Sequence, residues 1–236
     1  MVSALTSAQI GALTTDQVDV LSSTQIGALS SAQVAALATE DLATFSTADI
    51  AAISVKALSG LSTDNVAALN TNQAAALTTG QVAALKSSQI TALTSDQVGA
   101  LTTSQIGALG STQLAALSTD NIAALTTGQV AALNSKVVGA LTSAQIEALT
   151  SSQVDALTSA QIAALDSADI AALSTEDIAT FSTAEIAAIS VKALAGLSTD
   201  DISSLTSDQL QAITTTQLQA LDSAQVEAVI AAYQAI

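Results

Sequence analysis

An eight-residue phrase recurs along the whole of this chain and restricts its fold more than any other feature. With Leu5 at the first position, a large apolar residue returns at every eighth position as far as Val229, without an insertion or a deletion. The consensus is Leu-[Thr/Ser]-[Ser/Thr]-x-Gln-[Ile/Val]-x-Ala, in about 29 octads. A chain this regular is expected to repeat one structural unit and to bury its core between successive units.

Neither a long helix nor a plain strand suits an eight-residue period. In one continuous helix, each octad would move the apolar stripe by roughly 80° around the axis, so no face would stay apolar. In a straight strand, Leu5 and Ile10 would point to opposite faces of the sheet. The period therefore excludes a long coiled coil and a simple amphipathic strand.

Each octad instead carries the signals of a helix start. With Thr6 as the N-cap, its hydroxyl can accept from the backbone N–H of Gln9, and the Gln9 side chain can reach back to the N–H of Thr6. Leu5 and Ile10 then take the two positions of a hydrophobic staple. The next leucine, Leu13, ends this helix and begins the following unit. The sequence thus predicts a helix of about one and a half turns in every octad.

We predict an all-α fold for residues 1–236, a single repeat array that forms an elongated solenoid, or superhelical rod, with one very short helix per octad. Helices shorter than about 12 residues are marginal alone, so neighbouring units must stabilise them. Small residues at the seventh and eighth positions would let units approach closely, and Ser, Thr, Gln and Asp would face outward. A β-solenoid with corners at Ser and Thr is the alternative, and abundant Ala and Gln disfavour it.

Two nearly identical modules, residues 38–64 and 174–200, interrupt the consensus. They contain TEDLATFSTADIAAISVKALSGLSTD and TEDIATFSTAEIAAISVKALAGLSTD, and their offset of 136 residues shows that the array is internally duplicated. Alanine replaces the fifth-position glutamine at Ala57 and Ala193. Apolar residues at helical spacing around this point predict a longer helix that runs through Ser54.

Charged residues in the two modules form the candidate contact site. One interpretation is a binding or lateral contact surface. The alternative is a bend or a thickened turn, with the acids at helix N-termini where the helix dipole favours them. Phenylalanines at the leucine position, Phe45 and Phe181, are expected in the core. The candidate contact residues are Glu40, Asp41, Asp49, Lys56, Glu176, Asp177, Glu185 and Lys192.

The last octads predict a different kind of element. Asp222 and Gln225 begin a helix that the chain does not interrupt, because Ile230 takes the place of the next capping residue. We expect residues 222–236 to form a C-terminal capping helix on the open solenoid. The N-terminal end shows no such cap, so we expect it either to stack on another subunit or to have been cut from a longer array.

Composition excludes several classes of function. The formal net charge is −16, and the only cations are Lys56, Lys86, Lys136 and Lys192, so nucleic acids and anionic membranes are poor partners. The chain has no Cys and no His, which removes thiol and imidazole catalysis and Cys/His zinc sites. We predict no catalytic residue, no cofactor and no enzyme activity. Without an 18-residue apolar run or a basic leader, we also predict no membrane insertion and no cleavable signal peptide.

Phrases such as LTTSQIGAL, LTSAQIEAL and LTSSQVDAL resemble the octapeptide tracts of large, acidic, repetitive secreted or surface proteins of Gram-negative bacteria. The resemblance covers the whole chain and implies an extracellular or cell-surface location. LTSDQVGAL is also similar to the opening of TAL-effector repeats. That likeness fails, because the period, the base-reading dipeptide and the positive charge of those repeats are missing here.

Three hypotheses of function follow. The first is a structural protein, an extracellular rod that self-associates end to end or laterally as a filament subunit, surface-matrix component or adhesin stalk. The second is a binding solenoid whose modules hold a protein or Ca²⁺, although no calcium-loop motif is present. The third is ice binding through a regular Thr face, which the mixture of Thr and Ser at the second and third positions disfavours.

Overall fold

The computed structural model describes residues 2–234. Over that range the chain is helical and contains no strand, so the predicted all-α fold of one short helix per octad is confirmed and the β-solenoid is wrong. The chain divides into two compact units, Met1–Ala124 and Leu125–Ile236.

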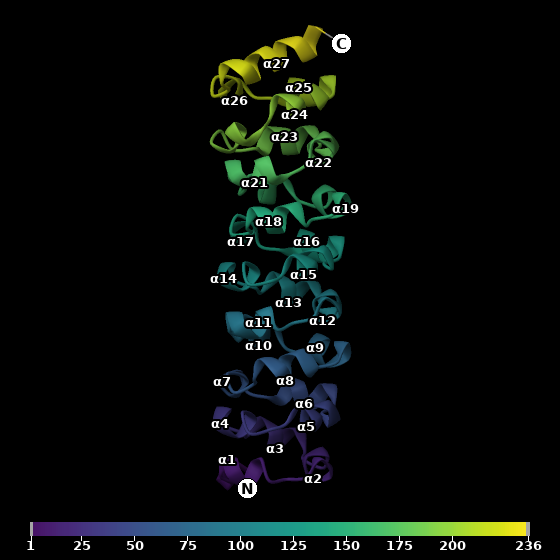
Figure 1. The fold of residues 1–236 in the computed structure, drawn as a ribbon, viewed down its shortest axis with the longest axis vertical. Helices are drawn as coiled ribbons and strands as arrows, with labels where there is room; N and C mark the ends of the chain where they lie inside the picture. Colours follow the sequence, from purple (N-terminus) through teal and green to yellow (C-terminus); the bar gives the residue numbers. More distant parts are fainter. Residues whose placement is uncertain (1, 235–236) are drawn as a thin grey trace. The chain divides into compact units, whose positions relative to one another are not determined.

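Successive helices of each unit follow the octads in chain order (Figure 1). Unit 1 contains η1 Val2–Ala4, α1 Ser7–Ile10, α2 Thr15–Asp19, α3 Ser23–Gly27, α4 Ser31–Val34, α5 Thr39–Thr44, α6 Thr47–Ala52, α7 Val55–Leu58, α8 Thr63–Ala68, α9 Thr71–Ala76, α10 Thr79–Ala84, α11 Ser87–Thr91, α12 Ser95–Ala100, α13 Thr103–Gly107, α14 Ser111–Leu114 and α15 Thr119–Ala123. Unit 2 contains α16 Thr127–Ala132, α17 Ser135–Val138, α18 Ser143–Glu147, α19 Ser151–Asp155, α20 Ser159–Ile162, α21 Ser167–Ala172, α22 Thr175–Thr180, α23 Thr183–Ala188, η2 Ala193–Gly196, α24 Thr199–Ser204, α25 Ser207–Ala212, α26 Thr215–Leu218 and α27 Ser223–Gln234.

The predicted capping box begins most of these helices. At α1, the Thr6 hydroxyl accepts from the backbone N–H of Gln9 at 3.2 Å, and the N–H of Thr6 donates to Gln9 Oε1 at 2.9 Å. At α10, Thr78 and Gln81 exchange the same two bonds at 2.6 and 3.1 Å. Because each cap holds its own residue in an extended conformation, it also ends the preceding helix.

The longer helix predicted through Ser54 is wrong. Helix α6 ends at Ala52, and Ser54 is extended, with φ −64° and ψ 145°. Its hydroxyl accepts from the N–H of Ala57 at 3.2 Å, so α7 begins as a separate helix. Serine is a strong N-cap, and half of the capping box is enough to break the helix even where the glutamine is missing.

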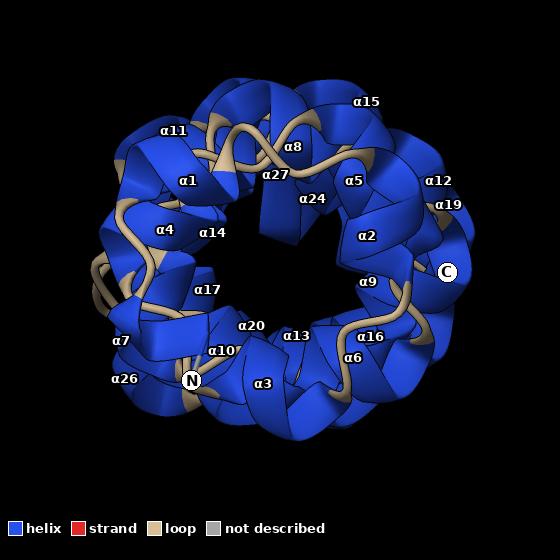
Figure 2. Cartoon of the chain, turned by 90° about the horizontal axis from the view of Figure 1, so that it is seen from below, coloured by secondary structure: helices blue, strands red, loops and turns tan. Residues whose placement is uncertain are grey.

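Residues at the first and sixth positions of the octad form the core of each unit. Ile10 is fully buried, and Phe45 and Phe181 are 5% and 3% exposed, as the pattern predicts. Helices three apart pack together, for example α1 with α4 and α3 with α6 in unit 1, and α18 with α21 in unit 2. Figure 2 views the chain from below, and among the helices of unit 1 it shows α1, α2 and α3 following one another around the axis, with α4 returning beside α1.

From Gln33 onward the fifth-position glutamines are buried, so the expectation that they face outward is wrong there, whereas Gln9 and Gln17 are exposed. Gln73 of α9 is 2% exposed. Its Oε1 accepts from the N–H of Asn70 at 2.9 Å, while its Nε2 donates to the carbonyls of Leu42 and Phe45, both at 2.8 Å. The amide thus caps its own helix and also ties α9 to the end of α5.

The same pattern repeats in both units, and we call it the carboxamide ladder. In unit 2, Nε2 of Gln161 donates to the carbonyls of Val130 and Leu133 at 2.8 and 2.9 Å. Since α9 packs on α6 but bonds to α5, one superhelical turn of unit 1 contains between three and four octads. Burying these amides costs little because both ends of each amide are hydrogen-bonded.

The duplicated modules contain a natural test of the cap. Ala38 begins α5 without a hydroxyl, whereas Ser174, at the same place before α22, accepts from the N–H of Asp177 at 3.2 Å. We expect Ala38→Ser to raise the free energy of unfolding by about 1 kcal/mol and Ser174→Ala to lower it by about the same amount. Urea unfolding followed by circular dichroism measures both. Shifts of the same sign in the two variants would contradict the capping role.

The last helix, α27, is longer than the others. Asp222 and Gln225 form its capping box, with bonds of 3.1 and 2.8 Å, and the helix continues to Gln234. It packs on α24 and α25. Residues 235–236 of the predicted capping helix lie outside the described residues. Val226, Ile230 and Tyr233 form an exposed apolar stripe along α27.

Candidate functional site

The acidic residues of the modules lie at helix starts. Asp41 and Asp177 occupy the fifth octad position of α5 and α22, and each is less than a tenth exposed. Oδ2 of Asp41 accepts from the N–H of Ala38 at 3.0 Å, and Oδ2 of Asp177 accepts from the N–H of Ser174 at 3.3 Å. Each of these two aspartates supplies the capping-box oxygen that glutamine supplies in other octads, but not the amide donor.

The remaining candidates do not gather into one cluster. Asp49 and Glu185 are half-buried caps of α6 and α23. The other four side chains, Glu40, Glu176, Lys56 and Lys192, are exposed. Within residues 2–234, no group of three or more acidic side chains is close enough to hold a metal ion.

Each module lies where the carboxamide ladder is interrupted. A carboxylate has no N–H, so it cannot donate to the carbonyls of the preceding turn. Instead, hydroxyls of that turn donate to it: Thr15 to Asp41 at 3.1 Å and Ser23 to Asp49 at 2.6 Å. We call these interruptions the acidic seams. Their fifth-position residues are Asp41, Asp49 and Ala57 in unit 1, and Asp169, Asp177, Glu185, Ala193 and Asp201 in unit 2.

The carboxylates of the seams differ in how well they are satisfied. Burial raises the pKa of Asp49, but donation from the Ser23 and Ser46 hydroxyls and from the Ser46 N–H outweighs it, so the pKa lies below its usual value. Burial raises the pKa of Asp169, and the nearby charge of Asp166 adds to the rise. Oδ1 of Asp177 is buried and has no hydrogen-bond partner among residues 2–234.

Asp169→Asn is expected to stabilise the protein at pH 7 by about 1 kcal/mol. The change removes a buried charge and adds an N–H within reach of the Leu141 carbonyl, by analogy with Asn65 Nδ2, which donates to the Leu37 carbonyl at 3.2 Å. Because the folded-state pKa of Asp169 is raised, the wild type regains stability as pH falls through that pKa. The advantage of the variant should therefore shrink on acidification.

Urea unfolding at several pH values measures this difference. Asp49→Asn is the control, since the depressed pKa of Asp49 marks a carboxylate that stabilises the fold above its unfolded-state pKa. We expect that variant not to gain stability at pH 7. An Asp169→Asn variant that is less stable than the wild type at pH 7 would contradict the interpretation that the buried charge of Asp169 destabilises the fold.

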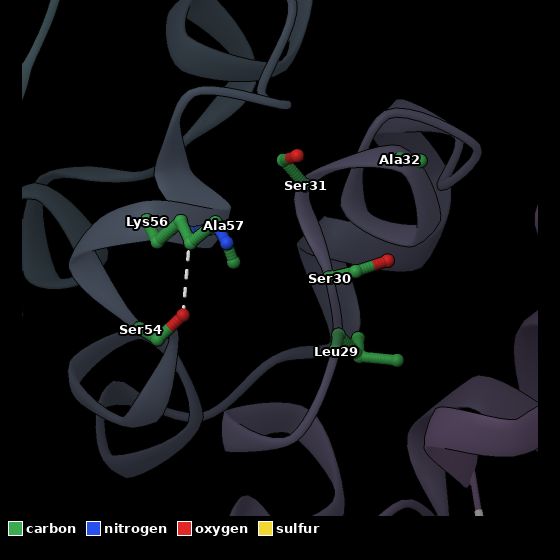
Figure 3. A pocket seen from close by; sticks show the side chains of 7 residues that line it. All are labelled: Leu29, Ser30, Ser31, Ala32, Ser54, Lys56 and Ala57. Atoms are coloured by element: carbon green, nitrogen blue, oxygen red, sulfur yellow. Dashed lines mark hydrogen bonds between the residues drawn. The ribbon is translucent and has the colours of Figure 1, made fainter.

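A pocket of about 240 Å³ lies in unit 1 where α7 packs on α4 (Figure 3). Its lining comes from the start of α7, with Ser54, Lys56 and Ala57, and from the segment that begins at Leu29 and enters α4. Ala57 is the fifth-position residue of its octad, so the pocket occurs where the ladder glutamine is missing. The sequence showed the loss of glutamine but not the space that the loss leaves.

Lysines accompany the octads that lack a polar fifth residue. Lys56 and Lys192 precede Ala57 and Ala193, and Lys136 precedes Val137, a third such octad that sequence reasoning missed. The fourth lysine, Lys86, has another role: it is an N-cap, and its Nζ donates to the Ser59 carbonyl at 2.9 Å. No helix in residues 2–234 is long and apolar enough to cross a membrane.

A family model described as the ALTTAQ repeat matches nine overlapping or adjacent stretches of the chain. They are residues 2–31, 34–71, 42–79, 74–111, 103–135, 137–167, 162–199, 170–207 and 183–215. The chain belongs to the ALTTAQ repeat family. No curated protein matches it.

The motif of the ALTTAQ repeat spans the boundary between two octads. It is visible as ALTTGQ at residues 76–81 and as ALTTSQ at residues 100–105. The structure explains its parts: the leucine is core, the first threonine is the N-cap, and the glutamine is both the capping-box acceptor and the donor of the ladder. In the acidic seams, the chain departs from the ALTTAQ motif at its last letter, the glutamine.

Proposed function

We propose that this ALTTAQ repeat protein is a structural element, an extracellular rod that serves as a filament subunit, a surface-matrix component or an adhesin stalk. The ladder carries the proposal. In most octads, the polar side chains with hydrogen-bonding chemistry are used to cap a helix and to tie one turn to the turn before it. Asn65, Gln73 and Gln81 illustrate this use, since their amides bond to main-chain groups.

The charge of the chain supports an exposed structural role. The chain has twenty acidic side chains and only four lysines, which gives the surface a strongly negative potential. Such a surface keeps the protein hydrated and discourages unspecific association with nucleic acids. Absence of Cys from the sequence also makes folding independent of the redox state of the compartment.

Self-association end to end is part of the proposal. Gln9 and Gln17 take the fifth octad position in the first turn of unit 1, and both are exposed. Their Oε1 atoms serve capping boxes, but their Nε2 groups have no hydrogen-bond partner among residues 2–234. Carbonyl groups of a second copy could accept from them, which would extend the ladder from one molecule to the next.

Negative-stain microscopy and sedimentation at increasing protein concentration test this. We expect particles of the wild type to lengthen with concentration. In the double variant Gln9→Glu/Gln17→Glu, the capping boxes are kept and the donors are lost, so we expect the particles to stay monomeric. A wild-type protein that stays monomeric at all concentrations would contradict self-assembly. Protease shaving of intact cells that make the protein tests the extracellular location.

A further inference from the structure

The pocket beside Ala57 corresponds to the place that a glutamine side chain fills in other octads. In α11, Nε2 of Gln89 donates to the carbonyls of Leu58 and Leu61, which precede it by 31 and 28 residues. A glutamine at position 57 would reach Ile26 and Leu29 by the same offsets. Leu29, the residue of one expected acceptor, lines the pocket together with Ala57 (Figure 3).

The polar groups that would serve this missing amide are still present. In a capping box, the N–H of the cap residue donates to the glutamine oxygen, as Lys86 does to Gln89 at 2.9 Å. Here the cap residue is Ser54, and its N–H has no hydrogen-bond partner among residues 2–234. Over the same range, the carbonyl of Leu29 accepts no hydrogen bond. One unpaired main-chain donor and one unpaired main-chain acceptor therefore belong to residues that line the pocket, and the pocket is large enough to admit an amide group.

We propose that this pocket binds a primary carboxamide, the side chain of a glutamine or asparagine from a partner protein. The amide oxygen accepts from the Ser54 N–H, and the amide NH₂ donates to the Leu29 carbonyl. Lys56, which lines the pocket, adds a positive charge that attracts the oxygen. A carboxylate fits less well, because it would present an unprotonated oxygen to the Leu29 carbonyl.

Propionamide is the probe, since it carries the amide and the short stem of a glutamine side chain. Its few heavy atoms limit the affinity, so we expect a dissociation constant on the order of 1–100 mM. The chain has only four lysines, so selective ¹⁵N-lysine labelling of the full chain gives four backbone amide signals. Lysine-to-arginine variants assign them. Lys56 reports on the pocket, and Lys86, whose octad holds Gln89, is the internal control.

We expect propionamide to shift the Lys56 signal with saturation and to leave the Lys86 signal unchanged. Sodium propionate at the same concentration should shift Lys56 at least several-fold less. In Ala57→Gln, the built-in side chain occupies the pocket, so the Lys56 response to propionamide should disappear. Ala57→Leu, which fills the space without an amide, provides the same block should the glutamine variant not fold.

Three results would overturn the proposal. They are a Lys56 signal that does not respond to propionamide, an equal response to propionate, and a response that persists in the folded variant with a filled pocket. The experiment is independent of self-assembly, because it is read from the monomer at low protein concentration.

Discussion

Gln81→Glu is expected to lower the free energy of unfolding by about 3–5 kcal/mol. Gln81 is 1% exposed, and its Nε2 donates to the carbonyls of Ile50 and Ile53 at 2.8 and 2.7 Å. Glutamate keeps the size of the side chain and the capping oxygen, but it loses both donors and places a buried negative charge against two carbonyl oxygens. Urea unfolding followed by circular dichroism measures the loss.

The control is Gln9→Glu. Gln9 has the same octad position and the same capping bond, 2.9 Å from the Thr6 N–H, but it is exposed and makes no ladder bond among the described residues. We expect that variant to change stability by less than about 0.5 kcal/mol. Equal losses in both variants would mean that glutamine acts only as a cap.

The pH dependence sharpens the same test. In the Gln81→Glu variant, burial should raise the folded-state pKa of the introduced carboxyl group above its unfolded value of about 4.3. Protonation then supplies an O–H donor, so the variant should regain part of its stability as pH falls through the folded-state pKa. A difference from the wild type that does not change between about pH 7 and pH 4.5 would argue against a lost donor as the cause.

Gly60→Ala is expected to destabilise unit 1 by about 3 kcal/mol. The turn after α7 approaches α4 so closely that a β-carbon at Gly60 would overlap the carbonyl oxygen of Ser31 and lie 3.1 Å from the backbone N of Ala35. Both obstacles are backbone atoms, which cannot turn aside as a side chain can. Gly196 lies in the same way against Ser167 in unit 2, so Gly196→Ala should have a similar effect.

Gly80→Ala is the matched control, and its expected effect has the opposite sign. Gly80 lies within α10, and the nearest atoms to a β-carbon there are the Thr78 hydroxyl and a Val55 methyl, both at 4.0 Å. Removing glycine from a helix without a clash should stabilise the protein by about 0.5–1 kcal/mol. Differential scanning calorimetry of both variants gives the two signs. A neutral Gly60→Ala would show that the two helices can separate without cost.

Local chemistry made the helices predictable. Four residues within six positions determine each helix start, as Leu5, Thr6, Gln9 and Ile10 do for α1. A capping box and a hydrophobic staple involve no contact that is distant in the sequence. For that reason the starts of the helices follow from the phrase wherever the cap residue and the glutamine are both present. Ser54 was misjudged because its octad lacks the glutamine, yet a single hydroxyl still ended the helix.

The partners of glutamine could not be predicted, because they lie nearly four octads away and depend on how many units make one turn. One signal was available in the sequence. Glutamate serves a capping box as well as glutamine does, and this acidic chain uses it at the fifth position only at Glu185. Such a preference for the amide indicates that its NH₂ group has a buried acceptor. The pocket at Ala57 then follows from the same reasoning, since the acceptor remains when the amide is lost.

The ladder also explains how an array of this kind can change its length. Each octad with a fifth-position glutamine offers the same donor and uses two acceptors of the same kind, so gain or loss of a whole octad only moves these glutamines to another set of equivalent carbonyls. The offset of 136 residues between the two modules equals a whole number of octads, so it keeps the spacing between each glutamine and its acceptor carbonyls. We therefore expect the fold to tolerate insertion or deletion of a whole octad better than a change of any other length. Insertion or deletion of a single residue, by contrast, would displace the glutamines of the next few octads from the carbonyls that lie 28 and 31 residues before them.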